Sequence, residues 1–353
     1  MSAIDKDEES AYRAVGVDID AQDEALAKVK DLVKSTEVPG VLSELGSFGG
    51  LFRPELSGFQ EPVLVSSADG VGTKLMVARM AEDYSTVGRD LVNHCVNDIL
   101  VQGAVPLFFL DYVGAGVLEP QAATDLVRGV AAGCRENGCA LLGGETAEMP
   151  GFYSPGDYEL VGFVVGLVDR PKLIDGSRIE PGDAILGLPS SGLHTNGYSL
   201  ARHTFFEKLG LGLEDPLPSG ASVKQTLLEV HRTYLPLLRS HLSNPALHGV
   251  AHITGGGLTD NIPRILPAGC SAVINLERLP SREVFEVIGE TGVSEEEMLR
   301  VFNMGIGMVL VVGREESARL AAVLRAQGEN VVQLGEIVEG SGTVNYRRSA
   351  GSV

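Results

Sequence analysis

The sequence predicts an α/β (α+β) fold of two domains, in which helices cover mixed sheets. The chain has 353 residues, a length that suits two domains of ordinary size. Hydrophobic residues make up 44% of it, which is enough to form a sizeable core. Strand-like and helix-like patterns alternate in both halves, and this alternation is typical of sheets with helices packed on them.

The first half opens with a short solvated tail at residues 1–11 and an amphipathic helix at residues 21–35. A loop with two glycines follows at residues 47–58. A later helix has clear end signals, because Pro120 suits its first turn and Gly138 lies just past its last turn. The other predicted elements are strands at 63–68, 105–112, 139–142 and 159–168 and a helix at 87–102.

A cluster of proline, glycine and aspartate turns at residues 169–183 separates the two halves. We therefore predict a domain boundary near residue 170, with an N-terminal domain over 12–169, a C-terminal domain over 170–345 and a short tail at 346–353. The second half predicts strands at 184–188, 271–274, 307–312 and 331–335 and a helix from about Asn196.

The charge of the chain restricts its partners. Lys and Arg number 28 against 47 Asp and Glu, which gives a formal net charge of −19 at pH 7. Such a chain is poorly suited to a phosphate backbone or an anionic membrane, so we expect no nucleic acid and no membrane partner. Anionic small molecules must be met by local positive groups or by a bound divalent metal.

The N-terminus and the cysteines indicate a cytoplasmic protein. The opening MSAIDKDEES lacks the basic and apolar layout of a secretory signal. No apolar run approaches the roughly 18 residues needed to span a bilayer. The four cysteines show no CxxC spacing, which favours reduced thiols in the core.

The motif SSADGVGTK follows the first predicted strand and contains groups that suit a phosphate and a metal. Asp69 offers the hard oxygen ligand that Mg²⁺ prefers. Gly70 and Gly72 let the backbone approach a phosphate closely, and Lys74 offers a point charge. The GxxxxGK[ST] pattern of a Walker A loop is absent, and an ordinary Asp-Gly turn also fits the spacing.

The predicted helix at 87–102 has one continuous polar face with i, i+3, i+4, i+7 and i+8 spacing. The residues on this face are Asp90, Asn93, His94, Asn97 and Asp98. Their short side chains hold a fixed geometry better than Lys and Glu would, which favours a site-lining role. A solvated helix face is the equally open alternative.

The segment GGETAEMPG places Glu145 and Glu148 beside two glycines at the end of a predicted strand. Strand ends are favoured places for sites in α/β sheets. A plain loop explains the segment as well.

Two histidines of the second half lie beside glycine-rich loops. His194 lies in LPSSGLHTNGYSL, and His252 opens HITGGGLTDNI, whose helix we expect to be capped by Thr259 or Asp260. Glycine loops at helix N-termini bind anions without many basic residues. A structural loop histidine is the alternative for His194, and a core histidine is favoured for His252 because its neighbours are strand-like.

Taken together, these segments resemble the phosphoribosylformylglycinamidine cyclo-ligase family, also called the aminoimidazole ribonucleotide synthetases. The resemblance runs from YRAVGVDID at residues 12–20 to about residue 335. Its six ordered blocks are SSADGVGTK, VNHCVNDILVQGAVPLFFLDY, ALLGGETAEMPGFY, GLPSSGLHTNGYSL, HITGGGLTDNIPRILP and FNMGIGM. Val15 and Gln22 depart from the alanine and glycine of the family pattern, at positions where we expect no chemical group.

The resemblance implies a two-domain fold of the aminoimidazole ribonucleotide synthetase type, with an N-terminal domain that binds ATP and forms a homodimer. Asp69 and Asp98 are implied to be Mg²⁺ and nucleotide residues, and Asp98 and His194 to be catalytic. The implied cofactor-binding residues are Asp69, Gly70, Gly72, Lys74 and Glu145. The implied substrate-binding residues are Ser190, Ser191, Gly192, His194 and Asn196.

The implied reaction converts ATP and formylglycinamidine ribonucleotide to ADP, phosphate and aminoimidazole ribonucleotide. ATP would phosphorylate the amide-type oxygen, and a nitrogen of the same substrate would then attack that carbon and expel phosphate. His194 is a candidate for proton transfer or phosphate contact. The alternatives are another ATP-using member of the superfamily, similar to formylglycinamidine synthetase, or a non-catalytic nucleotide-binding homologue.

Overall fold

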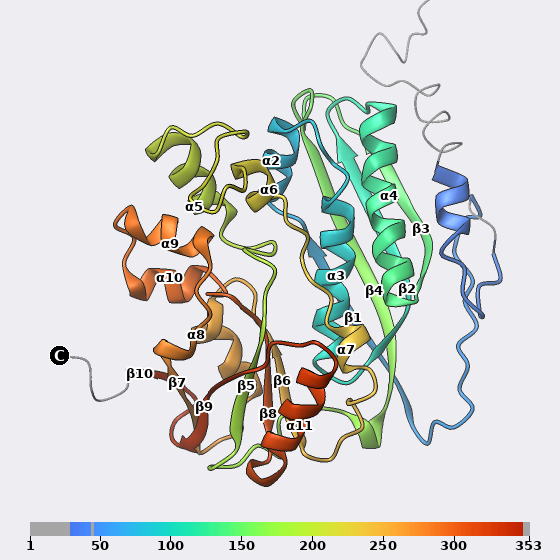
Figure 1. The fold of residues 1–353 in the computed structure, drawn as a ribbon. Coiled ribbons are helices and arrows are strands. Elements are labelled where there is room, and N and C mark those ends of the chain that lie inside the picture. The colour runs from blue at the N-terminus through green and yellow to red at the C-terminus, as the bar shows by residue number, and fades with distance from the viewer. Residues whose placement is uncertain (1–28, 44–45, 349–353) are drawn as a thin grey trace, which may run out of the picture.

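Two β-sheets with helices packed on them form the fold (Figure 1). The computed structural model describes residues 29–43 and 46–348. The first sheet has the order β1 (Pro62–Gly70), β4 (Tyr158–Asp169), β2 (Val105–Ala115) and β3 (Ala140–Glu148). The second has the order β10 (Val344–Arg347), β7 (Cys270–Asn275), β9 (Val332–Glu339), β5 (Ala184–Pro189), β8 (Ile306–Val312) and β6 (Leu247–His252). Both sheets mix parallel and antiparallel pairs, so the predicted class is confirmed.

Helices α3 (Val87–Leu100) and α4 (Pro120–Asn137) cover one face of the first sheet (Figure 1). The apolar side of α3 packs against the sheet with fully buried side chains such as Leu91 and Ile99. Gly88 lets the two helices approach closely, because a Cβ there would lie 2.2 Å from the Leu126 carbonyl oxygen. This close pair fixes α3 rigidly, so that its polar side faces the second half of the chain.

The other face of the first sheet carries exposed apolar side chains. Leu64 of β1 is 65% exposed and Phe163 of β4 is 45% exposed. They share a face because the register pairs Leu64 with Leu167 and Ala68 with Phe163. Val164, on the opposite side of β4, is fully buried toward the helices.

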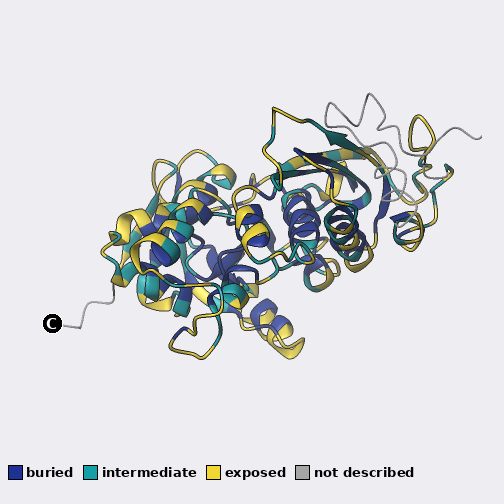
Figure 2. Ribbon diagram, turned by 90° about the horizontal axis from the view of Figure 1, so that it is seen from above, coloured by how far each residue is buried: buried dark blue, intermediate teal, exposed yellow. Residues whose placement is uncertain are grey.

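Short helices connect the remaining strands. They are α2 (Lys74–Met80), α5 (Tyr198–Arg202), α6 (Val223–Leu227), α7 (Leu235–Leu238), α8 (Gly257–Asn261), α9 (Glu283–Glu290), α10 (Glu295–Val301) and α11 (Arg314–Ala326). A π-helical turn at His203–Lys208 follows α5, and 3₁₀ turns lie at Arg170–Lys172, Ile262–Ile265 and Leu276–Arg278. Seen from above, buried residues fill both cores and continue between the two halves (Figure 2).

Most predicted elements are present, with several differences. The short tail predicted at 346–353 is wrong for its first two residues, because Tyr346 and Arg347 belong to β10 and pair with β7. The strand predicted at 139–142 continues to Glu148, because residues 143–148 pair in parallel with β2, so the alternative of a plain loop there is wrong. The helix after the HITGGG segment begins at Gly257 with Gly256 as its N-cap, so the caps predicted at Thr259 or Asp260 are wrong. Of the helix predicted at 21–35, residues 29–34 are helical and the earlier part, like the tail at 1–11, lies outside the described residues.

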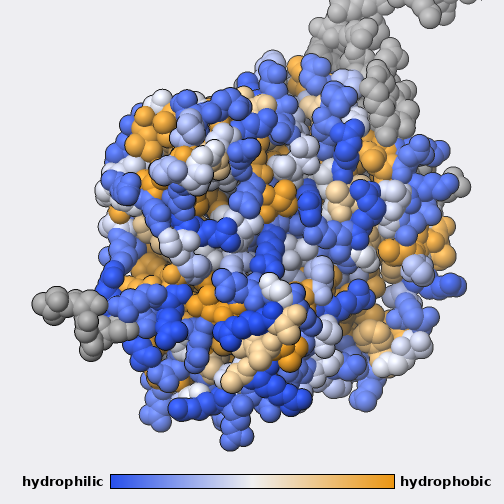
Figure 3. Space-filling model, viewed as in Figure 1, coloured by the Kyte–Doolittle hydropathy of each residue, from blue (hydrophilic) through white to orange (hydrophobic). Residues whose placement is uncertain are grey.

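The visible surface is mainly hydrophilic, with scattered apolar patches (Figure 3). Within residues 29–43 and 46–348, no helix is long and apolar enough to cross a membrane. The two sheets share no strand, and residues 170–183 connect them. The domain boundary near residue 170 stays a prediction.

Candidate active site

The two halves of the chain meet along a contact that we call the seam. On one side lie α3 and the end of β1, and on the other lie residues 190–196, 229–234 and 252–257. The seam opens into a cavity of about 480 Å³. Both halves line this cavity, the first with Asp69, His94 and Asp98 and the second with His252, Thr254, Asn261 and Arg264.

Asp69 lies at the end of β1, where the strand delivers its carboxylate to α3. Its Oδ2 lies 2.8 Å from His94 Nε2, and its Oδ1 accepts a hydrogen bond from the Gly70 N–H at 2.7 Å. Burial alone would raise the pKa of Asp69, but the hydrogen bond and charge of His94 lower it overall. Asp69 is therefore held as a carboxylate that faces the cavity.

Asp98 lies one turn after His94 on the same face of α3. Its Oδ1 accepts from His252 Nδ1 at 2.8 Å, and its Oδ2 accepts from Ser67 Oγ at 3.0 Å. Burial raises the pKa of Asp98, but the hydrogen bond and charge of His252 lower it below its usual value. Asp69 and Asp98 thus present two ionised oxygen donors to one cavity, and this donor chemistry fits a divalent cation such as Mg²⁺.

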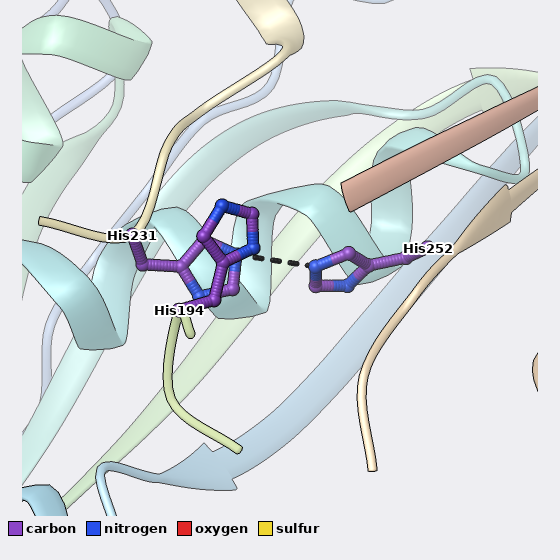
Figure 4. A group of neighbouring side chains, drawn as sticks. All are labelled: His194, His231 and His252. Carbon is purple, nitrogen blue, oxygen red and sulfur yellow. Dashed lines mark hydrogen bonds between the residues drawn. The ribbon is translucent and has the colours of Figure 1, made fainter. Parts of the chain in front are cut away.

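A chain of side chains joins these two carboxylates across the seam. His252 Nε2 lies 3.1 Å from His231 Nε2, whose Nδ1 lies 3.3 Å from Thr195 Oγ1, and that hydroxyl lies 2.7 Å from His94 Nδ1 (Figure 4). In order, the chain is Asp98, His252, His231, Thr195, His94 and Asp69. The first half of the protein supplies the two ends of the chain, and the second half supplies the three residues between them.

Hydrogen-bond roles within this chain depend on the tautomers of its three imidazoles. Asn97 Nδ2 also lies 3.2 Å from His231 Nε2 and donates to it, because Asn97 Oδ1 accepts from the Tyr234 N–H. Burial lowers the pKa of His94, but the neighbouring carboxylates of Asp69 and Asp98 raise it overall. Burial lowers the pKa values of His231 and His252, so His94 is the ring of the three whose charged form is favoured most.

The rest of the polar face of α3 holds the backbone of residues 231–234. Asp90 Oδ1 accepts from the His231 N–H at 2.6 Å, and Asn93 Nδ2 donates to the His231 carbonyl at 2.7 Å. Asn97 Oδ1 accepts from the Tyr234 N–H at 3.0 Å. All three are buried, so the alternative of a solvated face is wrong.

Lys74 lies deep in the seam. Its Nζ lies 2.7 Å from Asp90 Oδ2, and it donates to the carbonyl of Glu229 at 2.6 Å and to that of His194 at 3.3 Å. Its side chain is fully buried. A lysine has three donors, and all three are used here, so none is left for a phosphate in this arrangement. The phosphate contact predicted for Lys74 stays a prediction.

His194 lies on the seam with an unusual backbone. Its φ of +61° is in the left-handed region, and its ring stacks on that of His231 with centroids 4.0 Å apart (Figure 4). Its Nε2 accepts from the Ser191 N–H at 3.2 Å, while its buried Nδ1 has no hydrogen-bond partner. Burial and the nearby positive groups lower the pKa of His194 far below its usual value, so the ring is neutral.

The other predicted substrate residues form the wall behind His194. Ser190 Oγ donates to Asn303 Oδ1 at 3.0 Å and Ser191 Oγ donates to the Val230 carbonyl at 2.6 Å. Both hydroxyls therefore bind within the protein. Asn196 keeps a buried Nδ2 that has no partner.

Glu145 lies apart from this cavity. It lines a second cavity of about 730 Å³ together with the neighbouring Gly143 and Gly144 and the sheet residues Tyr112 and Phe163. The structure therefore brings Asp69, Asp98 and the His194 loop together at the seam and leaves Glu145 in the second cavity.

Sequence reasoning missed His231 and Thr195. His231 lies in EVHRTYLP, which has no glycine loop or recurring spacing that would mark it. Thr195 follows His194 in a motif that was recognised, but only the fold brings its hydroxyl to His94.

Comparisons with known proteins agree with this architecture. Residues 58–168 match the family model described as AIR synthase related protein, N-terminal domain, and residues 180–347 match its C-terminal domain. The solved structure of thiamine-monophosphate kinase from Stenotrophomonas maltophilia superposes with a TM-score of 0.66 at 17% identity, covering 92% of this chain and 97% of that one. Hydrogenase maturation protein HypE in complex with ATP gives a TM-score of 0.65 at 20% identity, covering 92% of each chain. These two show a shared fold.

Curated relatives are much more similar in sequence. The phosphoribosylformylglycinamidine cyclo-ligase of Geobacter sulfurreducens is 49% identical over 330 residues, which cover 93% of this chain and 95% of that one. The enzyme of the same name from Geobacillus kaustophilus is 49% identical over 334 residues, covering 94% and 96%. At this identity over nearly the full length, the chain belongs to the phosphoribosylformylglycinamidine cyclo-ligase family.

Proposed function

We propose that this chain is an ATP-dependent cyclo-ligase that converts formylglycinamidine ribonucleotide to aminoimidazole ribonucleotide in purine biosynthesis, with release of ADP and phosphate. The observation that carries the proposal is the 49% identity to cyclo-ligases over 93% of the chain. The geometry supports it, because the carboxylates of the first half line one cavity with His252 of the second half, and Thr195 of the His194 loop contacts His94 beside them.

The chemistry requires an oxygen to be made a good leaving group. Transfer of the γ-phosphoryl group of ATP to the amide oxygen of the substrate forms a C–O–P linkage and releases ADP. The ring nitrogen then forms its bond to that carbon, the C–O bond breaks, and phosphate leaves with the oxygen. The protein contributes mainly positioning and charge stabilisation.

Asp69 and Asp98 would hold Mg²⁺, which neutralises phosphate charge when bound. His94 and His252 orient their carboxylates through single hydrogen bonds, as outer partners of metal ligands commonly do. The neighbouring carboxylates raise the pKa of His94 and so favour its charged form, which would offset the charge of Asp69.

The proposed reaction is tested by direct turnover. Purified protein with Mg²⁺ and ATP is expected to form one aminoimidazole ribonucleotide for each ATP consumed. The superfamily alternative is tested in parallel with formylglycinamide ribonucleotide, ATP and an ammonia source. Nucleotide binding without product from either substrate would favour a non-catalytic homologue, and ring closure without ATP would contradict the proposal.

His194 is expected to bind the substrate. Its ring is neutral and carries an unpartnered Nδ1 at the seam, which suits a hydrogen bond to a substrate oxygen. His194→Gln should therefore raise KM for the ribonucleotide about tenfold and change kcat less. A fall in kcat of about 10²-fold or more at unchanged KM would instead indicate proton transfer. Steady-state kinetics with a melting curve distinguish these results from a loss of stability.

We also propose a homodimer that forms through the first sheet. Leu64 and Phe163 expose apolar surface on its helix-free side, and a second copy would bury it. Light scattering at micromolar concentration should give twice the mass of one chain. The Phe163→Glu variant should give a mass closer to that of a single chain. A monomeric wild-type protein would contradict this prediction.

A cytoplasmic location follows from the same proposal. All four cysteines, Cys95, Cys134, Cys139 and Cys270, are free and buried, as expected in a reducing compartment.

A further inference from the structure

Two side chains, those of Arg282 and Asn303, bind three consecutive carbonyl groups, those of residues 190–192. Arg282, at the residue before α9, donates to the carbonyl of Ser191 at 2.8 Å and to that of Ser190. Asn303 Nδ2 donates to the carbonyl of Gly192 at 2.9 Å. We call Arg282 and Asn303 the carbonyl clamp.

The clamp has its own firm support. Asn303 is buried, and its Oδ1 accepts from Ser190 Oγ at 3.0 Å and from the Gly305 N–H at 2.8 Å, which fixes the orientation of the amide. Arg282 is only partly buried. Its two donor nitrogens belong to one charged, planar guanidinium group, whose hydrogen bonds are stronger than those of neutral groups. The arginine therefore supplies the charged half of the clamp.

The clamp determines how the His194 ring is presented. The Ser190 carbonyl and the Ser191 N–H belong to one planar peptide unit, so Arg282, by binding that carbonyl, helps direct the Ser191 N–H to His194 Nε2 at 3.2 Å. A nitrogen that accepts this bond carries no proton, so in the neutral ring the proton lies on Nδ1. The left-handed φ of His194 costs free energy and persists only where the surrounding structure fixes it. The carbonyl clamp is one of the contacts that fix this loop.

The resulting Nδ1–H is an unsatisfied donor. It is buried without a hydrogen-bond partner. The His194 ring packs against His231 beside the cavity-lining His252, and one ring nitrogen of each of the three lies within 4.8 Å of the others. A buried donor without a partner is unfavourable, and a ligand oxygen that enters the seam would satisfy it.

We propose that Arg282 is a positioning residue, which holds the loop so that His194 presents its Nδ1–H to an oxygen of the ribonucleotide substrate. The substrate part of this inference rests on the proposed function. Arg282 is inferred to act through the carbonyls of Ser190 and Ser191, to which it donates its hydrogen bonds.

The first test measures the His194 tautomer without substrate or turnover. Protein labelled with ¹⁵N-histidine is compared by long-range ¹H–¹⁵N NMR as wild type, Arg282→Gln, Arg282→Lys and Arg278→Gln, with His194→Gln used to assign the signal. Arg278 is an exposed arginine four residues earlier and serves as the matched control. Wild type and Arg278→Gln should show a single Nδ1–H form, Arg282→Gln a mixture, and Arg282→Lys an intermediate result. An unchanged single tautomer in Arg282→Gln would overturn the proposal.

The second test separates substrate binding from stability. Arg282→Gln should raise KM for formylglycinamidine ribonucleotide about tenfold, leave KM for ATP unchanged and lower kcat little. Arg282→Lys should recover part of this loss, because one ammonium can hold one of the two carbonyls. If Arg282→Gln does not fold, Arg282→Lys is used instead, and its KM for formylglycinamidine ribonucleotide should be raised by a smaller factor. Equal changes in both KM values would reject positioning of His194. Wild-type protein without ring closure would reject the proposed function while leaving the tautomer comparison valid.

Discussion

Asp98→Asn is expected to lower kcat for ring closure by at least about 10²-fold while the protein stays folded. The substitution removes the charge and nearly preserves the shape, and an asparagine Oδ1 can still accept from His252 or Ser67. What is lost is a charged oxygen donor at the cavity. Charge stabilisation by a bound cation is worth several kcal/mol, and each 1.36 kcal/mol corresponds to about tenfold in rate.

Asp69→Asn should behave similarly, with a further effect on Mg²⁺ dependence. Both variants should need more Mg²⁺ for half-maximal rate, because each removes one of the two carboxylates proposed to hold the cation. Loss of Asp69 also removes the charged partner of His94, so the pKa of that ring should fall. Rates measured across a Mg²⁺ titration, with melting curves, give both quantities.

Asp125→Asn is the matched control for these two variants. Asp125 lies on α4 in a surface ion pair with Arg128, and such pairs contribute about 0–1 kcal/mol. Its kcat and Mg²⁺ dependence should equal those of the wild type. If Asp69→Asn or Asp98→Asn has a near-normal kcat and a normal Mg²⁺ dependence, the proposal that this residue is a Mg²⁺ ligand is wrong.

The α/β alternation was predictable from the sequence because it depends on local patterns. The end signals of α4 were correct, with Pro120 in the first turn and Gly138 at φ +68° after the last. The extent of β3 was not, because its glycines are poor strand residues and remain extended only through pairing with β2. Pairing of this kind is tertiary, and no window of sequence shows it.

In the candidate site, too, local patterns were predictable and tertiary contacts were not. Helical spacing correctly placed His94 and Asp98 on one face of α3, but it left open whether that face meets water or protein. The fold answers this question with the backbone of residues 231–234, which occupies Asp90, Asn93 and Asn97. Asp90, Asn93 and Asn97 bind backbone groups, which every residue has. The side chains of residues 231–234 therefore give no sign in the sequence that this contact exists.

Lys74 shows the limit of motif reasoning most clearly. In DGVGTK, a lysine after two glycines has the composition of a phosphate loop. In the fold, the same ammonium pairs with Asp90 at 2.7 Å and binds two carbonyls of the second half. Burial lowers the pKa of Lys74 and raises that of Asp90, and the charge of each partner opposes these shifts.

Lys74→Met is accordingly expected to destabilise the protein strongly. It leaves the carboxylate of Asp90 buried without a cation, a change that typically costs about 3–5 kcal/mol and corresponds to a fall in Tm of roughly 10 °C. Arg79→Met, on the same helix α2, breaks an exposed ion pair with Asp157 and should cost less than about 1 kcal/mol. Calorimetric melts of both variants measure the difference.

The pH dependence of this loss identifies Asp90 as its source. Burial already raises the pKa of Asp90 above its ordinary 3.8, and removal of Lys74 raises it further. The folded variant then binds a proton more tightly than the unfolded chain, so stability is retained at low pH and lost as pH rises through the folded pKa. The Tm deficit relative to wild type should therefore be smaller at pH 5 than at pH 7.5. Lys74→Met/Asp90→Asn, which removes both charges, should recover much of the Tm and lose the pH dependence. A deficit that is equal at both pH values, or unchanged in the double variant, would show that packing of the lysine stem rather than the unpaired carboxylate sets the stability of the seam.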